Sequence, residues 1–226
     1  MYQILKAEKL ADKIYLMDVK APRVACACEP GEFVIVKMDE EGERIPLTIC
    51  DFNREEGTIT IVFQTVGAST EKMAELKAGD AFRDVVGPLG NASDFVKEDV
   101  AELKNKKYLF VAGGVGAAPV YPQVKWMHEH GIDVDVIVGS KTKDLIILEE
   151  EMKAVAGNLY ITTDDGSYER KGMVTEVINW VKLWLILVCK VSISLVIRDK
   201  ISPCVLLSKY FKGILLIFTE MSFLRL

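Results

Sequence analysis

The segment Val111-Ala-Gly-Gly-Val-Gly-Ala-Ala-Pro119 carries the strongest chemical signal in the chain, because three glycines stand between a predicted strand and a predicted helix. Gly113, Gly114 and Gly116 would let the backbone turn sharply and approach a diphosphate, whose charge is favoured at the start of the following helix. The fingerprint G-x-G-x-x-G of dinucleotide-binding proteins is incomplete, since Pro119 stands where the third glycine would be. A tight turn with no ligand is therefore the alternative interpretation.

A second glycine precedes a predicted helix in Val66-Gly-Ala-Ser-Thr70. This segment could cradle a phosphate. The alternative is ordinary capping, in which Ser69 or Thr70 caps a short helix over residues 69–76.

The segment Glu43-Arg-Ile-Pro-Leu-Thr-Ile49 combines a cation with a hydroxyl on a predicted strand. Arg44 could pair with a phosphate, and Thr48 could hydrogen-bond the edge of a ring. Taken separately, Arg44 is better interpreted as a solvated side chain before a strand.

Polar residues also follow a predicted strand in Thr162-Thr-Asp-Asp-Gly-Ser167. They would lie at the carboxyl edge of a parallel sheet, where such sheets bind ligands, unless the segment is only an Asp-Gly turn. Cys26-Ala-Cys28 has no further ligands nearby, so we predict no metal site. We expect Cys50 to be a small core residue. We expect His128 and His130 to bond the last carbonyls of a helix and not to act in catalysis.

Two patterns of elements must position these residues. Residues 14–19, 33–38 and 58–63 alternate apolar and polar side chains between turn signals, which predicts an antiparallel barrel or sandwich. After a boundary near residues 92–106, predicted strands and helices alternate, which indicates a parallel sheet. The predicted strands are 108–112, 134–138 and 159–162, and the predicted helices are 119–130, 148–156 and 173–181.

Composition narrows the function classes. Half of the 226 residues are apolar and 8% are aromatic, which is a globular composition. The balance of 28 Lys and Arg against 33 Asp and Glu argues against a nucleic-acid partner, because phosphate binding needs clustered cations. Five cysteines, an odd number, and an N-terminus without a signal-peptide pattern predict a cytoplasmic protein.

Four segments in this order resemble the motifs of the ferredoxin–NADP reductase superfamily, and the resemblance covers about residues 1–181. The likeness is greatest to electron-transfer subunits of the dihydroorotate dehydrogenase B type and to the small subunit of NADH-dependent ferredoxin–NADP oxidoreductase, or sulfide dehydrogenase. The four segments are Glu43-Arg-Ile-Pro-Leu-Thr48, Val86-Gly-Pro-Leu-Gly90, Ala112-Gly-Gly-Val-Gly-Ala-Ala-Pro119 and Thr163-Asp-Asp-Gly-Ser167.

The resemblance implies a flavin-binding barrel that holds FAD. Pro46 and Leu47 would lie near the isoalloxazine ring, and Thr48, as the catalytic residue, near its N5 edge. Arg44 would help to hold the diphosphate. The turn on that diphosphate would consist of Gly67, Ala68, Ser69 and Thr70.

The resemblance also implies an α/β domain that binds NADH or NADPH. The predicted domains are an FAD-binding barrel over residues 1–95, an incomplete NAD(P)-binding domain over 106–181 and an atypical tail over 182–226. The dinucleotide would be bound by Gly113, Gly114, Val115, Gly116, Ala117, Asp164 and Asp165.

The function implied is that of an oxidoreductase subunit that passes electrons from NAD(P)H through FAD to a partner. The partner would be a catalytic or electron-accepting subunit, with ferredoxin as one candidate. The alternative is a flavin-binding or degenerate scaffold that does not turn over.

The tail, residues 182–226, departs from this pattern. It holds seven basic and two acidic residues, and 23 of its 45 residues are Ile, Leu, Val or Phe. The expected Gly-Pro turn and four-cysteine module are missing, and Cys189 and Cys204 cannot complete a two-iron two-sulfur cluster. The change suggests an altered reading frame or gene structure.

Two structural roles remain open for the tail. Residues 183–188 are apolar enough to supply the next strand of the parallel sheet. A membrane anchor over residues 183–197 is disfavoured, because the stretch is shorter than the roughly 20 residues that a spanning helix needs and Lys190 interrupts it.

Overall fold

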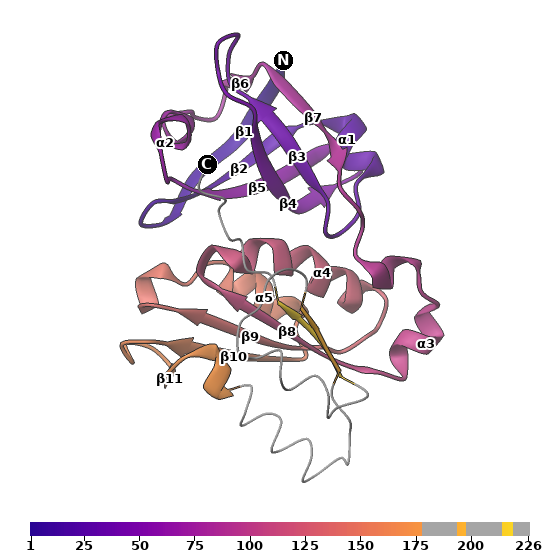
Figure 1. Ribbon diagram of the computed structural model, residues 1–226. Coiled ribbons are helices and arrows are strands. Elements are labelled where there is room, and N and C mark those ends of the chain that lie inside the picture. The colour runs from indigo at the N-terminus through magenta and orange to yellow at the C-terminus, as the bar shows by residue number, and fades with distance from the viewer. Residues whose placement is uncertain (178–193, 198–213, 219–226) are drawn as a thin grey trace. The chain divides into compact units, whose positions relative to one another are not determined.

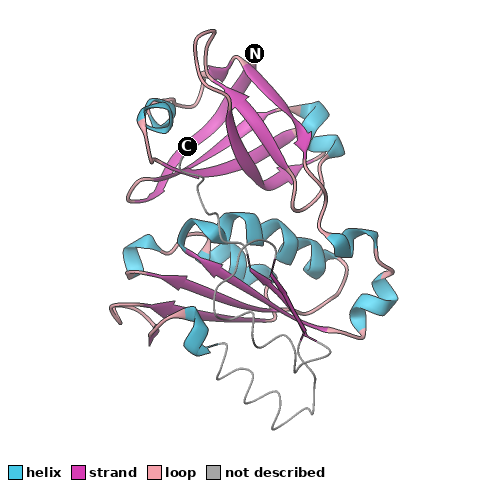
Figure 2. Ribbon diagram, in the orientation of Figure 1, coloured by secondary structure: helices cyan, strands magenta, loops and turns pink. Residues whose placement is uncertain are grey.

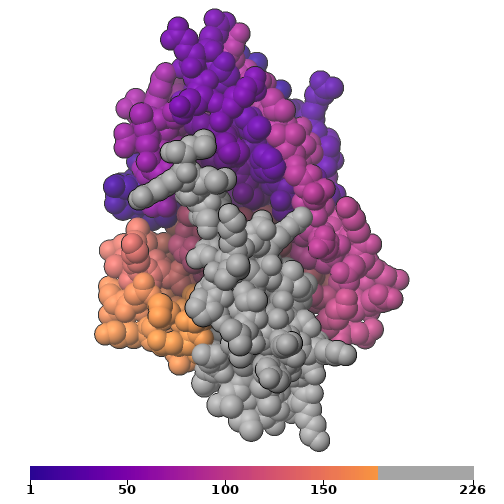
Figure 3. Space-filling model, in the orientation of Figure 1, coloured from indigo at the N-terminus to yellow at the C-terminus, as the bar shows by residue number. Residues whose placement is uncertain are grey.

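The computed structural model describes residues 1–177, 194–197 and 214–218 (Figure 1). The chain divides into two compact units, residues 1–97 with 121–123, and residues 98–120 with the remainder. Strands dominate the first unit, whereas strands and helices alternate in the second (Figure 2). Figure 3 draws all atoms in the same orientation, with the residues of the first unit in indigo to magenta.

The first unit is a nearly closed antiparallel barrel, which confirms the predicted fold class. Its sheet has the strand order β6-β1-β2-β5-β4-β3-β7. The strands are β1 (Tyr2–Ala11), β2 (Ile14–Lys20), β3 (Phe33–Lys37), β4 (Ile45–Asn53), β5 (Thr58–Gln64), β6 (Ala81–Phe82) and β7 (Asp84–Leu89).

Alternating side chains build the barrel core. Ile59, Ile61 and Phe63 of β5 are buried in one cluster with Leu47 and Ile49 of β4. Because successive side chains of a strand point to opposite faces, the residues between them face away from the core.

Two short helices join the barrel strands, where the sequence predicted only one. Helix α2 (Ala68–Ala74) confirms the predicted helix to within two residues. Helix α1 (Pro22–Ala27) was missed, because its six residues are too few to show a helical period and no side chain caps its start.

The second unit contains a parallel sheet, as predicted. Its strand order is β11-β10-β9-β8-β13-β12, and every neighbouring pair is parallel. The strands are β8 (Lys107–Gly113), β9 (Asp135–Ser140), β10 (Asn158–Thr163), β11 (Arg170–Lys171), β12 (Ser194–Ile197) and β13 (Ile214–Phe218).

The helices of this unit begin at slightly different places from those predicted. Helix α4 starts at Ala117, so Pro119 is its third residue and not its first. Asp99 caps a helix in the predicted connection by accepting a 2.7 Å hydrogen bond from Ala101 N. The helices are α3 (Val100–Lys104), α4 (Ala117–Glu129) and α5 (Glu149–Val155), with single turns η1 (Asp94–Lys97), η2 (Gly114–Gly116) and η3 (Lys143–Leu145). Residues 174–177 are also helical.

The strand beside β8 comes from an unexpected part of the sequence. We expected residues 183–188 to supply the next strand, but these residues lie outside those that the structure describes. The place beside β8 is taken by β13, in which Leu216 pairs with Leu109.

Candidate functional site

Strand β4 divides its pairing between two neighbours, and this leaves an open edge in the barrel. Ile45 to Thr48 pair with β3, whereas pairing with β5 begins only at Ile49 and shifts register before Asp51. The end of β5, from Val62 to Gln64, pairs with β2. Within the described chain, the facing edges of these two half-strands therefore lack a strand partner. Free backbone groups at such an edge can hydrogen-bond a ligand.

The side chains of β4 alternate across this edge. Leu47 is buried in the barrel core, whereas Pro46 is exposed and Thr48 is half-buried. Leu47 can therefore offer only its backbone to a ligand on the outer face. The Thr48 hydroxyl has no hydrogen-bond partner among the described residues, so it is free to bond a ring edge.

The turn before α2 is held by its own side chains. Gly67 is the N-cap, so the prediction of Ser69 or Thr70 at that position was wrong. The Thr70 hydroxyl accepts hydrogen bonds from Val66 N (2.9 Å) and Gly67 N (3.2 Å). Thr70 thus fixes the conformation of this turn, while the neighbouring Ala68 begins the helix.

The structure brings two predicted segments together, because the Ser69 hydroxyl hydrogen-bonds the Glu43 carboxylate. Arg44, by contrast, turns toward Asp84, with 3.8 Å between Nη1 and Oδ2. That ion pair is exposed, so it contributes only about 0–1 kcal/mol and can be exchanged for a phosphate.

A cavity of about 580 Å³ lies between the β3–β4 loop and α2. The acidic side chains that line it outnumber its one cation, Lys72, whose hydrogen bond holds the pKa of Asp39 below its usual value. Carboxylates accept hydrogen bonds from hydroxyl and amino groups and repel phosphate. The acids are Asp39, Glu40, Glu41 and Glu43.

In the second unit, the glycine-rich turn leaves its backbone accessible. Gly114 has a φ of 54°, and apart from the adjoining residues no atom of the described chain lies within 4 Å of where a Cβ of Gly113 or Gly114 would be. Val115 is half-buried, and Gly116 caps the 13-residue helix α4. Ala117 is fully buried, so only its backbone N–H can face a ligand. This arrangement fits a diphosphate at a helix N-terminus.

The predicted acids lie at the carboxyl edge of the sheet. Asp164 N donates to Ser140 O at 3.0 Å, and Asp165 N donates to Lys141 O at 3.3 Å. Hydrogen bonds from the side chain and backbone of Ser167 hold the pKa of Asp165 below its usual value. Both carboxylates are exposed, so both can meet a ligand.

Sequence reasoning missed one hydroxyl at this edge, that of Ser140, whereas Thr162 belongs to the polar segment that was expected here. Ser140 Oγ and Thr162 Oγ1 are buried and have no hydrogen-bond partner among the residues that the structure describes. Thr162 pairs with Gly139, which in turn pairs with Gly113 of the glycine-rich turn. A polar residue at the end of a predicted buried strand was the available signal.

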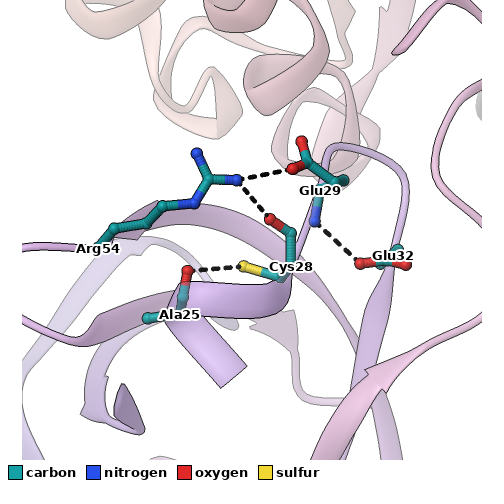
Figure 4. A network of polar contacts seen from close by, with 5 residues as sticks. All are labelled: Ala25, Cys28, Glu29, Glu32 and Arg54. Carbon is teal, nitrogen blue, oxygen red and sulfur yellow. Dashed lines mark hydrogen bonds and ion pairs between the residues drawn. The ribbon is translucent and has the colours of Figure 1, made fainter. Parts of the chain in front are cut away.

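The cysteine-containing segment has a structural role (Figure 4). Arg54 Nη2 donates to the Cys28 carbonyl (2.9 Å) and to Glu29 Oε1 (2.8 Å), and Glu29 N donates to Glu32 Oε2. The Cys28 thiol donates to Ala25 O, and burial raises its pKa to about 12. The thiol is therefore protonated at neutral pH and poorly suited to redox or metal chemistry.

The remaining predictions concern a histidine, a cysteine, metal binding and a membrane anchor. His130 Nδ1 lies 2.7 Å from Trp126 O, which confirms its bond to the end of α4. Cys50 is buried, as expected. Across the described ranges, no three His, Cys, Asp or Glu side chains are grouped to hold a metal ion. No helix in the described chain is long and apolar enough to span a membrane.

Comparison with known proteins decides the family. A protein from the adh 3′ region of Clostridium beijerinckii is 60% identical over 183 residues, which cover 79% of this chain and 62% of that protein. The dihydroorotate dehydrogenase B electron-transfer subunit homolog of Thermotoga maritima is 38% identical over 78% of this chain and 60% of its own length. The chain belongs to the ferredoxin–NADP reductase superfamily.

Solved structures agree with this assignment. The structure of an NADH-dependent reduced ferredoxin-NADP oxidoreductase matches with a TM-score of 0.72 and 36% identity, over 80% of this chain and 63% of that one. No family model matches the chain. The chain spans about three-fifths of the length of the two curated relatives named above.

Proposed function

We propose that this chain binds FAD in its first unit and NAD(P)H in its second, and passes electrons to a partner protein. The split pairing of β4 carries the proposal, because it places Thr48 at an open edge of the barrel. Bound FAD would supply the hydride acceptor N5 and then release electrons singly.

The residues of the first unit would hold and orient the flavin. Pro46 offers an apolar outer face to the ring, Leu47 offers its backbone, and the Thr48 hydroxyl is free to hydrogen-bond the N5 edge. Arg44 would leave Asp84 for the diphosphate. The turn that includes Gly67, Ala68, Ser69 and Thr70 would approach the same diphosphate through its backbone.

The residues of the second unit would hold the dinucleotide. The open backbone at Gly113 and Gly114 fits a close diphosphate, and the N-terminus of α4 favours its charge. Asp164 and Asp165 would bond the sugar hydroxyls at the carboxyl edge of the sheet.

A cytoplasmic partner subunit would accept the electrons. The relatives of this chain support the proposal that it donates electrons to a partner, since they are named electron-transfer subunits. Ferredoxin is one candidate acceptor. The alternative function, a flavin-binding scaffold without turnover, rests on the unusual composition of residues 182–226.

Flavin analysis and an NADH titration test the proposal together. Purified chain should release FAD, and its flavin should be reduced by NADH or NADPH. Release of FMN, or failure to bind FAD on reconstitution, contradicts the proposed cofactor. Bound FAD that neither nucleotide reduces favours the scaffold.

A further inference from the structure

Two carboxylates of the first unit bind the groups that the diphosphate of a flavin would need. The Ser69 hydroxyl donates a hydrogen bond to the Glu43 carboxylate. Arg44 Nη1 lies 3.8 Å from Asp84 Oδ2. Carboxylates and phosphates are both anions that accept hydrogen bonds, so each acid takes the place that a phosphate oxygen would have at its partner. Both expected diphosphate contacts are therefore made internally in this structure.

The β3–β4 loop, which carries Glu43, is also held to α2 at its other end. Lys72 Nζ of α2 lies 2.6 Å from Asp39 Oδ2, and this hydrogen bond raises the pKa of the lysine. Arg83 Nη2, on the link between β6 and β7, lies 2.7 Å from Glu40 Oε1. Because the start of the loop is fixed to two other segments, Glu43 at its end stays beside the first turn of α2.

The charge of this loop is unfavourable for a second anion. The loop brings four carboxylates to a cavity of about 580 Å³, whose described lining includes one cation, Lys72. Two charges of the same sign about 4 Å apart in water change an affinity by roughly fivefold. A diphosphate that approaches Ser69 must therefore displace Glu43, because it cannot bind favourably beside it.

We propose that Glu43 is an internal competitor for the flavin diphosphate, and that its carboxylate holds the Ser69 hydroxyl until FAD displaces it. This inference rests on the proposed flavin site of the first unit. A ligand that offers only phosphate groups gains little from the exchange, since one anion merely replaces another. Strand β4 would hold the ring of FAD as well, which offsets the cost of displacement. The contact thus selects a whole flavin dinucleotide over ADP.

Calorimetric titration of the full chain, freed of flavin, with FAD, ADP and riboflavin tests the proposal. Glu43→Gln keeps the size of the side chain and removes its charge, so it should bind FAD and ADP about threefold to tenfold more tightly than the wild type. Riboflavin has no phosphate, so its affinity should change by less than about twofold. An equal gain for riboflavin would overturn the competition with the diphosphate.

Two further variants separate this contact from the general charge of the loop. Glu41→Gln is the matched control, because it removes the same charge from the lining of the same cavity, and it should change the FAD affinity by less than about twofold. In Ser69→Ala the contact is lost, so Glu43→Gln should add less than about twofold there. A gain from Glu41→Gln as large as that from Glu43→Gln, or an undiminished gain in Ser69→Ala, overturns the proposal.

The same titrations distinguish a failure of this proposal from a failure of the flavin site. If the wild type binds FAD and Glu43→Gln binds it no more tightly, the competition is overturned and the site remains. If neither the wild type nor Glu43→Gln binds FAD or riboflavin, the proposed flavin site itself is overturned.

Discussion

The two candidate sites differ in how their polar groups are satisfied. At the barrel, Ser69 is bonded to Glu43, Thr70 to its own turn and Arg44 to Asp84. At the sheet edge, the hydroxyls of Ser140 and Thr162 have no partner within the described ranges, and the backbone of the glycine-rich turn is accessible there. Except at the Thr48 hydroxyl, a flavin would therefore replace existing contacts, whereas a dinucleotide would complete missing ones. We expect substitutions at the sheet edge to have the larger effects.

Gly113 and Gly139 pair across the sheet, and substituting each by alanine should distinguish an effect on folding from an effect on dinucleotide binding. A Cβ at Gly139 would lie 2.3 Å from Val174 Cγ1, so Gly139→Ala should destabilise the second unit by about 1–3 kcal/mol. Gly113 has an extended backbone and open space around it, so Gly113→Ala should fold normally. It should nevertheless weaken dinucleotide binding, because its methyl group fills the diphosphate approach. Urea unfolding measures the stability of both variants, and calorimetry measures their dinucleotide binding. Similar unfolding curves for Gly139→Ala and Gly113→Ala would contradict the close contact between Gly139 and Val174.

The hydroxyl of Thr48 should affect the flavin's chemistry more than its retention. A single hydrogen bond contributes about 0.5–1.5 kcal/mol to binding, so Thr48→Ala should keep most of its FAD. Its flavin reduction rate and potential should change, and Thr48→Ser should restore them. Unchanged values in Thr48→Ala would remove Thr48 from the site.

Two serine substitutions compare the sites directly. Ser140→Ala removes an unpaired buried hydroxyl, so without dinucleotide it should stabilise the chain by about 1 kcal/mol. Ser69→Ala removes an exposed contact and should change stability by less than about 0.5 kcal/mol. Thermal unfolding measures both. A destabilised Ser140→Ala would mean that its hydroxyl is already satisfied in the free protein.

The smallest expected effect is the dependence of the barrel's stability on pH through the buried thiol of Cys28. A cysteine thiol in water has a pKa of 9.0, and burial in the folded chain raises the pKa of Cys28 to about 12. Between these values the unfolded chain ionises first, so stability is unaffected below pH 9.0 and falls as the pH rises toward 12. Cys28→Ala should flatten this decline.

In alkylation followed by peptide mapping at neutral pH, exposed Cys26 should react before Cys28 and Cys50.

Local patterns made much of this fold predictable. The alternation in residues 58–63 predicted β5, and in the structure β4 follows the same alternation, with Leu47 buried and Thr48 half-buried. Helix α1 has only six residues, which are too few to show the helical repeat of apolar side chains. Other features depend on contacts between distant segments, such as the unpaired hydroxyl of Ser140 and the bond between Ser69 and Glu43. The switch of β4 from one neighbour to another likewise has no signature in its own residues.

Anaerobic mixing of the FAD-loaded chain with NADH tests the central claim most directly. The visible absorbance of the flavin should bleach, and adding an electron acceptor should restore it. FAD that stays oxidised in excess NADH and NADPH, on a chain that binds ADP-ribose, would contradict electron transfer between the two units.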